Sequence, residues 1–188
     1  MKRLLAIFAL MFVFGSAAAQ LPPPIDLGII NLPQNGPVWC WAAVARQIIA
    51  WKRQNLSAAP EQCALVAMAN GAPPPVCCAG VNPACNITGS IPQIQGLIAN
   101  FGASYSSVAP PANPMVLYNT LASGRPIILQ IATGPGMAHV VVLQGMQWYQ
   151  TPMGPRAMLH INDPMNIYPA PVPFENIAPI WMSAIVVN

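Results

Sequence analysis

The sequence predicts an α+β domain in which helices come first and an antiparallel sheet follows. Two patterns support this class. Between residues 40 and 123 apolar residues recur at helical spacing, and after Gly124 the pattern changes to short runs rich in β-branched residues. We therefore expect a single domain over residues 20–188, with a helical lobe at about 34–124 and a β lobe at about 125–188.

Residues 1–19 have the composition of an export signal. Lys2 and Arg3 precede an apolar run, and small residues at 17–19 provide a cleavage site. The apolar run is too short to span a bilayer, and no later segment is long enough. We therefore expect a secreted protein, extracellular or periplasmic, with no membrane span once the signal is removed.

The chain after this signal is nearly uncharged. Without Lys2 and Arg3 the formal charge falls from +3 to +1, because five basic and four acidic residues remain. Such a balance gives no reason to expect a nucleic-acid partner. We expect a monomer that needs neither a metal nor a cofactor.

The first expected helix runs from Cys40 to Trp51. Residues 20–33 before it are proline-rich, which favours an extended chain. In the helix, bulky apolar side chains recur at spacings that bring them onto one face: Trp41, Val44, Ile48 and Trp51. We therefore predict a largely buried helix that has Cys40 in its first turn.

Three later helices are expected, each with a start signal and a stop signal. Their expected ranges are 60–69, 91–100 and 114–123. The candidate N-terminal caps are Ser57, Ser90 and Asn113, and the glycines beyond the ends are Gly71, Gly102 and Gly124. Four strands are then expected at 125–131, 139–149, 156–163 and 181–187, with a turn at 151–155.

Five cysteines in an exported chain indicate disulfides and one unpaired thiol. Cys77 and Cys78 are adjacent and rarely bond each other, so we expect one of them to pair with Cys63 and the other with Cys85. A zinc site is the alternative, but the cluster lacks two spaced Cys-x-x-Cys pairs and a nearby histidine. By elimination, Cys40 is the free thiol.

Cys40 is well placed to act as a nucleophile, because the positive end of a helix dipole stabilises a thiolate. A base must then come from one of two histidines, His139 and His160. A hairpin centred near Thr151 places His139 opposite Asp163, where the carboxylate can hold the imidazole in one tautomer.

The same register pairs His160 with Val142 and directs it, with Asn162, to the opposite face of the sheet. A β-bulge would change this parity.

Each of these residues also has an ordinary structural interpretation. Cys40 fits the packing of an alanine-rich helix, His139 fits a satisfied strand residue, and Gln34 fits a solvated loop. Gln34 lies six residues before Cys40, however, and a side-chain amide there can donate to an oxyanion beside the Cys40 backbone N–H. The agreement of these features favours a catalytic site.

Residues 30–187 resemble papain-like cysteine peptidases, in particular a small bacterial branch that includes staphopain-like and plant-pathogen effector peptidases. The segment "QNGPVWCWAA" carries most of the likeness, and "GRPII", "HVVVLQG" and "INDP" also have counterparts. The resemblance implies Cys40 as nucleophile, His139 as general base and acid, Asp163 as its orienting group, and Gln34 as oxyanion donor. It also implies a buried, Cys-bearing helix packed on an antiparallel β lobe.

Two residues are expected to shape the substrate cleft. The family commonly has a glycine before its histidine, whereas this chain has Ala138, whose side chain would narrow the cleft. Trp39, directly before Cys40, is expected to line or shield the same cleft.

We therefore expect a secreted cysteine peptidase that acts on a protein or peptide substrate. The alternatives are an amidase or acyl transferase of the same fold acting on cell-wall peptides, and a secreted effector or binding module without catalytic activity.

Overall fold

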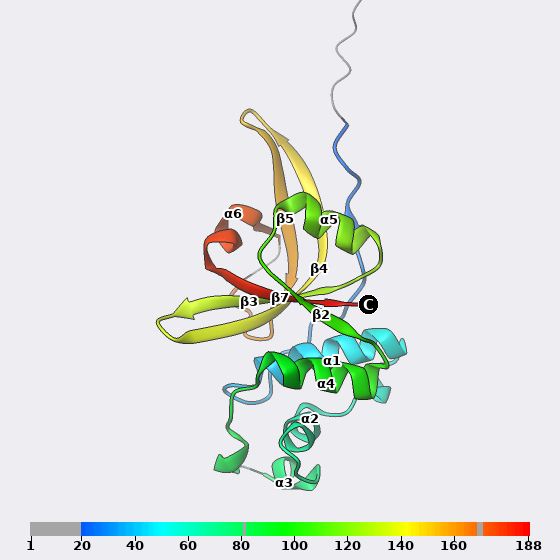
Figure 1. Ribbon diagram of the computed structural model, residues 1–188, viewed down its shortest axis with the longest axis vertical. Helices are drawn as coiled ribbons and strands as arrows, with labels where there is room; N and C mark the ends of the chain where they lie inside the picture. Colours follow the sequence, from blue (N-terminus) through cyan, green and yellow to red (C-terminus); the bar gives the residue numbers. More distant parts are fainter. Residues whose placement is uncertain (1–19, 81, 169–170) are drawn as a thin grey trace, which may run out of the picture.

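The computed structural model describes residues 20–80, 82–168 and 171–188. The expected export signal lies outside these ranges. Within them, no helix combines the length and the apolar composition needed to cross a membrane. The helices between Cys40 and Gly102 cluster at one end of the molecule, and the sheet, with the later helices beside it, occupies the other (Figure 1).

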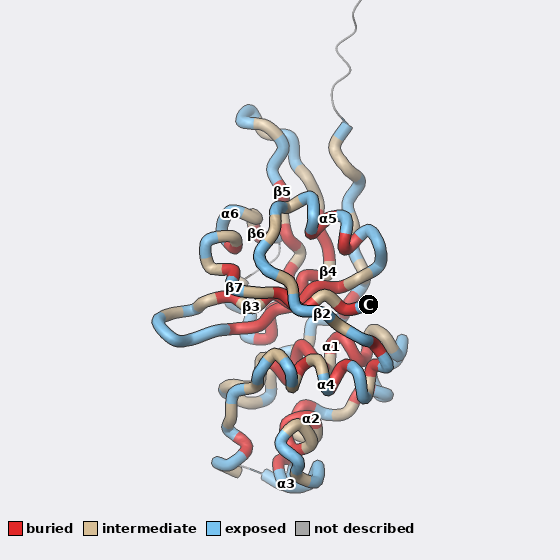
Figure 2. Tube along the Cα trace, in the orientation of Figure 1, coloured by how far each residue is buried: buried red, intermediate tan, exposed pale blue. Residues whose placement is uncertain are grey.

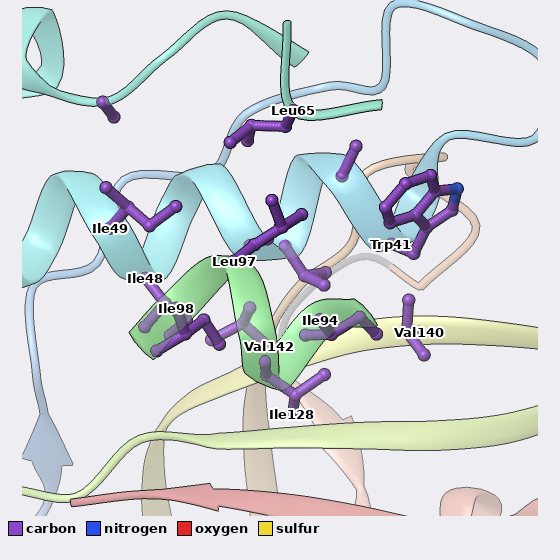
Figure 3. Close-up of a cluster of buried hydrophobic side chains, with 14 of the residues drawn as sticks. Trp41, Ile48, Ile49, Leu65, Ile94, Leu97, Ile98, Ile128, Val140 and Val142 are labelled. Carbon is purple, nitrogen blue, oxygen red and sulfur yellow. The ribbon is translucent and has the colours of Figure 1, made fainter. Parts of the chain in front are cut away.

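The first helix is the centre of the helical lobe, in which four α-helices and two 3-10 turns follow one another: α1 (Cys40–Arg53), η1 (Leu56–Ala58), α2 (Gln62–Ala69), α3 (Pro75–Cys78), η2 (Pro83–Cys85) and α4 (Ile91–Gly102). Helix α1 packs against both α2 and α4, and its apolar side chains fill the space between them and the sheet (Figure 3). The start of α1 at Cys40 and the buried positions of Trp41, Val44 and Ile48 confirm the predicted helix.

The helix ends lie where the local sequence signals predict them, with two exceptions. The Ser90 hydroxyl and the Gln93 side chain form a capping box at the start of α4, as the sequence favours. The expected stop, Gly102, is instead the last helical residue, because Ala103 takes the left-handed conformation that ends the helix. Ser57 lies in η1 rather than capping α2, which begins after Glu61.

The sheet contains seven strands: β1 (Ile25–Asp26), β2 (Ser106–Ala109), β3 (Ile127–Gly134), β4 (Met137–Thr151), β5 (Gly154–Asn162), β6 (Val172–Pro173) and β7 (Trp181–Val187). Its order is β2-β7-β3-β4-β5-β6, with β1 paired to β4, and every pairing is antiparallel. The four expected strands are confirmed, as is the α+β class, whereas β1, β2 and β6 were not expected.

Both faces of the sheet are buried at its centre (Figure 2). Val140 and Val142 point into the core shared with α1, while Val141 and Leu143 belong to a second core on the opposite face. That second core is covered by α5 (Pro114–Ala122), α6 (Phe174–Ile177) and η3 (Ala178–Ile180). Helix α5 was expected with the helical lobe, but its buried residues pack on the sheet.

The register of the β4–β5 hairpin differs from the prediction. Thr151 pairs with Gly154 across a two-residue turn, and a bulge between Leu143 and Gly145 shifts the pairing further along. As a result His160 lies opposite Gly145 rather than Val142. Gly145 must be a glycine, since a Cβ there would lie 2.4 Å from the carbonyl oxygen of Ile25 in β1.

Candidate active site

A cavity of about 440 Å³ lies between the two lobes. On the helical side its wall includes Gln34, Cys40 and Trp41. On the sheet side it includes Gln130 of β3 and, from β4, Ala138 and His139. The cavity therefore brings together residues that the chain separates by about a hundred positions.

Cys40 is the first residue of α1 and is half-buried. All five cysteines lie in the described ranges, and the other four form two disulfides, Cys63–Cys78 and Cys77–Cys85. The expected disulfides and the free thiol are therefore confirmed, and the structure selects one of the two pairings that the sequence left open. The position at a helix start leaves the first backbone N–H groups without partners inside the helix.

His139 and Asp163 form a buried pair, although the residue opposite His139 on the neighbouring strand is Ile131. His139 Nε2 lies 2.6 Å from Asp163 Oδ1, and each residue is only 2% exposed. Beyond the bulge, on the side of His139, odd-numbered residues of β4 lie opposite odd-numbered residues of β5, as Leu143 does opposite Ile161. The expected contact therefore forms despite the wrong register.

The carboxylate of Asp163 is held by the backbone that follows it. Its Oδ1 accepts a hydrogen bond from the N–H of Met165 (2.8 Å), and its Oδ2 accepts from Ile167 (2.7 Å) and Tyr168 (3.0 Å). Three donors from one turn fix the carboxylate in a single orientation and stabilise its charge. The side chain that orients His139 is therefore itself rigid.

The charged form of this pair is favoured. Burial alone would lower the pKa of His139, but the hydrogen bond that the ring donates to Asp163 and the neighbouring Cys40 thiol outweigh it and raise the pKa to about 9. Burial likewise opposes ionisation of Asp163, yet hydrogen bonds from His139 and from the Met165 and Tyr168 N–H groups hold its pKa below the usual range. His139 is therefore an imidazolium at neutral pH.

The second ring nitrogen of His139, Nδ1, is not bonded to Asp163. Nδ1 is buried and has no hydrogen-bond partner of regular geometry among the described residues, and the Cys40 thiol is the side chain that interacts with the ring besides Asp163. A buried ring nitrogen that has no hydrogen-bond partner and lies beside a thiol is suited to exchange a proton with the sulfur or with a leaving group.

Gln34 lines the cavity on the Cys40 side. Its Nε2 donates to the carbonyls of Gly36 (2.8 Å) and Pro37 (3.0 Å), and its Oε1 is buried without a partner. Its backbone N–H donates to the carbonyl of Pro164 (3.0 Å), the residue after Asp163. The loop that carries Gln34 thus bridges the helical lobe and the turn of the acidic residue.

A comparison with known protein families assigns the chain. The model of the family Peptidase_C70, described as papain-like cysteine protease AvrRpt2, matches residues 26–172. The chain belongs to this family of cysteine peptidases. No curated protein sequence matches it.

The fold of this peptidase is also similar to a solved structure. A C39-like peptidase from Bacillus anthracis superimposes with a TM-score of 0.55 at 13% sequence identity, covering 89% of this chain and 98% of that one. At this identity the likeness concerns the fold alone, and it agrees with a papain-like arrangement.

The two tryptophans that flank Cys40 in the peptidase have different positions. Trp41 lines the active-site cavity, and its Nε1 donates to the carbonyl of Ile87 (3.2 Å). Trp39 is absent from the described lining of that cavity and instead lines a second one beside the disulfide loop, where its Nε1 donates to the carbonyl of Cys85 (2.8 Å). The structure therefore places Trp41, rather than the expected Trp39, in the described wall of this cavity.

Several residues of the cavity wall were not singled out from the sequence. Gln130 is oriented by the Ser183 hydroxyl, which donates to its Oε1 (2.7 Å), and Thr88, Met137 and Met165 complete parts of the wall. Ala138 lies in the wall as expected. In the part of the chain that the structure describes, no group of three His, Cys, Asp or Glu side chains is placed to hold a metal ion.

Proposed function

We propose that this secreted peptidase hydrolyses peptide bonds through a triad of Cys40, His139 and Asp163. The observation that carries the proposal is the buried His139–Asp163 pair, of which His139 lines the same cavity as the free thiol. The family assignment supports a protein or peptide substrate. Two disulfides are compatible with export.

The reaction proceeds in two halves. The Cys40 thiolate attacks the carbonyl carbon of the substrate, and the carbonyl oxygen becomes an oxyanion. His139 then gives its proton to the leaving amine, so the peptide bond breaks and an acyl-enzyme thioester remains. A water attacks the thioester after losing a proton to His139, which releases the acid and restores the thiolate.

Asp163 acts by holding His139 rather than by taking its proton. The carboxylate accepts from Nε2, which leaves Nδ1 on the side of the sulfur. A fixed anion also stabilises the imidazolium throughout the cycle. This division of roles explains why Asp163 has more hydrogen bonds than any other group in the site.

The oxyanion would be stabilised by two donors, the Cys40 backbone N–H and the Gln34 amide. The Gln34 Nε2 now bonds to two carbonyls of its own loop, so one of these bonds must be exchanged for the oxyanion during the reaction. The Cys40 N–H needs no such exchange, because it begins a helix.

The wall of the cavity favours uncharged substrate residues. Among its described residues, His139 is the one with an ionisable ring, and no Asp, Glu, Lys or Arg contributes. A charged side chain of a substrate would therefore lose water and find no counter-ion in the wall other than the reacting groups themselves.

The proposal is tested with wild type and Cys40→Ala on casein and on purified cell wall. We expect casein to be cleaved by wild type and left intact by the variant, and iodoacetamide to label Cys40 near neutral pH. Cleavage of the cell wall but not of casein would replace the peptidase assignment with an amidase. Equal digestion by both proteins, or a thiol that resists labelling, would refute the triad.

A further inference from the structure

We propose that Gln62, the first residue of α2, is a positioning residue for the oxyanion donor Gln34. The proposal rests on the function assigned above and extends it to a side chain outside the cavity. Gln62 lies 29 residues along the chain from Pro33 and is 1% exposed.

The Gln62 amide holds both peptide groups that flank Gln34. Its Nε2 donates to the carbonyl of Pro33 (2.7 Å), and its Oε1 accepts from the N–H of Asn35 (2.9 Å). One partner is an acceptor and the other a donor, so the orientation of the amide is unambiguous. These two bonds fix the backbone on either side of Gln34.

The same loop is tied on its other side to the β lobe. Gln34 itself donates through its backbone N–H to the Pro164 carbonyl, next to Asp163. The two peptide groups that flank Gln34 therefore make three hydrogen bonds between them, and the Gln34 side chain is the part left to move. Such support lets the Gln34 amide return to one position in each cycle.

Helix α2 provides a rigid base for this contact. The residue after Gln62 is Cys63, which is joined to Cys78, and the residue before it is Glu61, which pairs with Arg46 of α1. Leu65 and Val66, one turn further on, are fully buried. The loop of Gln34 is thus held from a helix that is itself fixed by a disulfide, an ion pair and the core.

A buried glutamine at this position has no evident role in packing alone. Burying an amide costs free energy unless both of its ends are bonded, and here both bonds go to one loop. A leucine of similar volume would leave the Pro33 carbonyl and the Asn35 N–H without partners.

Positioning of the oxyanion donor can be separated from general support of the site by comparing two reactions of Cys40. Turnover of an amide develops an oxyanion, whereas alkylation by iodoacetamide displaces iodide and develops none. Gln62→Leu should therefore lower kcat about 10- to 100-fold, less than the loss of an oxyanion donor, with KM within about twofold. The rate of alkylation should stay at the wild-type value.

Gln34→Ala and the double variant Gln34→Ala/Gln62→Leu complete the cycle. If Gln62 acts through Gln34, its replacement lowers kcat no further once the Gln34 amide is gone. Gln93→Leu is the matched control, since Gln93 also bonds to α2, at the Ala69 carbonyl, but far from the loop. Its kcat should equal that of wild type.

Gln62→Glu gives an independent test that does not depend on the folding of the leucine variant. A carboxylate repels the Pro33 carbonyl, whereas the protonated acid can donate to it and still accept from Asn35. The kcat of this variant should therefore rise toward that of wild type as the pH falls, while wild type shows no such rise.

The outcomes distinguish the two proposals. If Cys40→Ala is inactive and Gln34→Ala lowers kcat, the proposed function stands, and the inference is then overturned by any of three results. These are an unchanged kcat in Gln62→Leu, a parallel loss of kcat and alkylation, or losses that multiply in the double variant. An unchanged kcat in Gln34→Ala would refute the oxyanion role, and the inference with it.

Discussion

The two walls of the active-site cavity are held in place by different chemistry. On the β side, His139 is fixed by a buried ionic hydrogen bond to Asp163, whose carboxylate accepts three backbone N–H groups. On the helical side, the loop of Gln34 is fixed by neutral bonds, above all those of the buried Gln62 amide. Charged groups therefore hold the β-side wall in place, whereas neutral amide hydrogen bonds and disulfides hold the helical-side wall.

This difference predicts which wall of the cavity should respond to pH. The His139–Asp163 pair gains its stability from ionisation, so protonation or deprotonation changes it directly. The bonds of the Gln34 loop involve no titrating group and should persist across the same range. The predictions that follow test this contrast, beginning with the wall that carries charge.

Replacing Asp163 by Asn should have the largest effect. The Asn side chain turns one acceptor oxygen into an NH₂ group, which must oppose either the N–H groups of Ile167 and Tyr168 or those of Met165 and the His139 ring. It also removes the negative charge that stabilises the imidazolium. We expect kcat to fall about 10³- to 10⁴-fold. Steady-state kinetics on a peptide substrate measure this. Glu175→Gln, which alters an exposed carboxylate paired with Arg156, is the control and should leave kcat unchanged. A loss below tenfold in Asp163→Asn would contradict the assigned role.

Activity and stability should both depend on pH through the charged wall. The pKa of His139 is about 9 in the folded chain against an ordinary 6.5, so its contribution to the free energy of unfolding is complete below pH 6.5 and is lost as the pH rises through 9. The lowered pKa of Asp163 gives a contribution that is present above about 3.8 and is lost as the pH falls below that value. Activity should decline above pH 9, where His139 loses the proton that the leaving amine needs.

Urea unfolding and kcat/KM, each measured from pH 3 to 10, test both pH dependences: the alkaline limb set by His139 and the acidic limb set by Asp163. In Cys40→Ala the pKa of His139 should lie below 9, because the thiol is one of the groups that raise it, and NMR of the imidazole measures this. Gln62→Leu should leave the alkaline limb in place. A limb that moved with this neutral substitution would show that the two walls are not independent.

Removing the Cys77–Cys85 disulfide should weaken the neutral wall. The bridge closes a short loop, and Trp39 bonds to the Cys85 carbonyl. For the double variant Cys77→Ser/Cys85→Ser we expect roughly 2–3 kcal/mol less free energy of unfolding. Chemical denaturation with and without reductant measures it: reductant should lower the stability of wild type by at least as much. A variant as stable as oxidised wild type would show that the bridge does not constrain the unfolded chain.

The smallest expected effect is that of Trp39→Phe. Phenylalanine keeps most of the apolar contact but loses the hydrogen bond to Cys85, which costs about 1 kcal/mol of stability. Because Trp39 lies outside the active-site cavity, kcat/KM should be unchanged, whereas Trp41→Phe should alter it. A loss of turnover in Trp39→Phe would restore the cleft-lining role that its sequence position suggests.

Features set by neighbouring residues could be predicted from the sequence. The start of α1 at Cys40, the Ser90 and Asn113 caps and the four main strands follow from local patterns. Adjacent Cys77 and Cys78 limited the disulfides to two arrangements, and three-dimensional contact was needed to choose between them. The roles of Cys40, His139, Asp163 and Gln34 stay predictions, supported by the cavity that Cys40, His139 and Gln34 share and by the bond of Asp163 to His139.

Features set by distant contacts could not be predicted. The register of β4 and β5 depends on the bulge at Gln144, where the Ile25 carbonyl comes too close for any residue but Gly145. The two-residue strands β1 and β6 form by pairing with longer ones and have almost no pattern of their own. Gln62 reads as a surface residue in the sequence, since nothing local indicates that its amide meets a loop about thirty residues away.

The separation of Cys40 from the other cysteines has a consequence for how the enzyme withstands oxidation. Each of the other four cysteines is already in a disulfide, so a sulfenic acid formed on Cys40 finds no resolving thiol within the molecule. Rescue of the oxidised enzyme must then come from a small external thiol, and without one further oxidation to the sulfinic acid is irreversible.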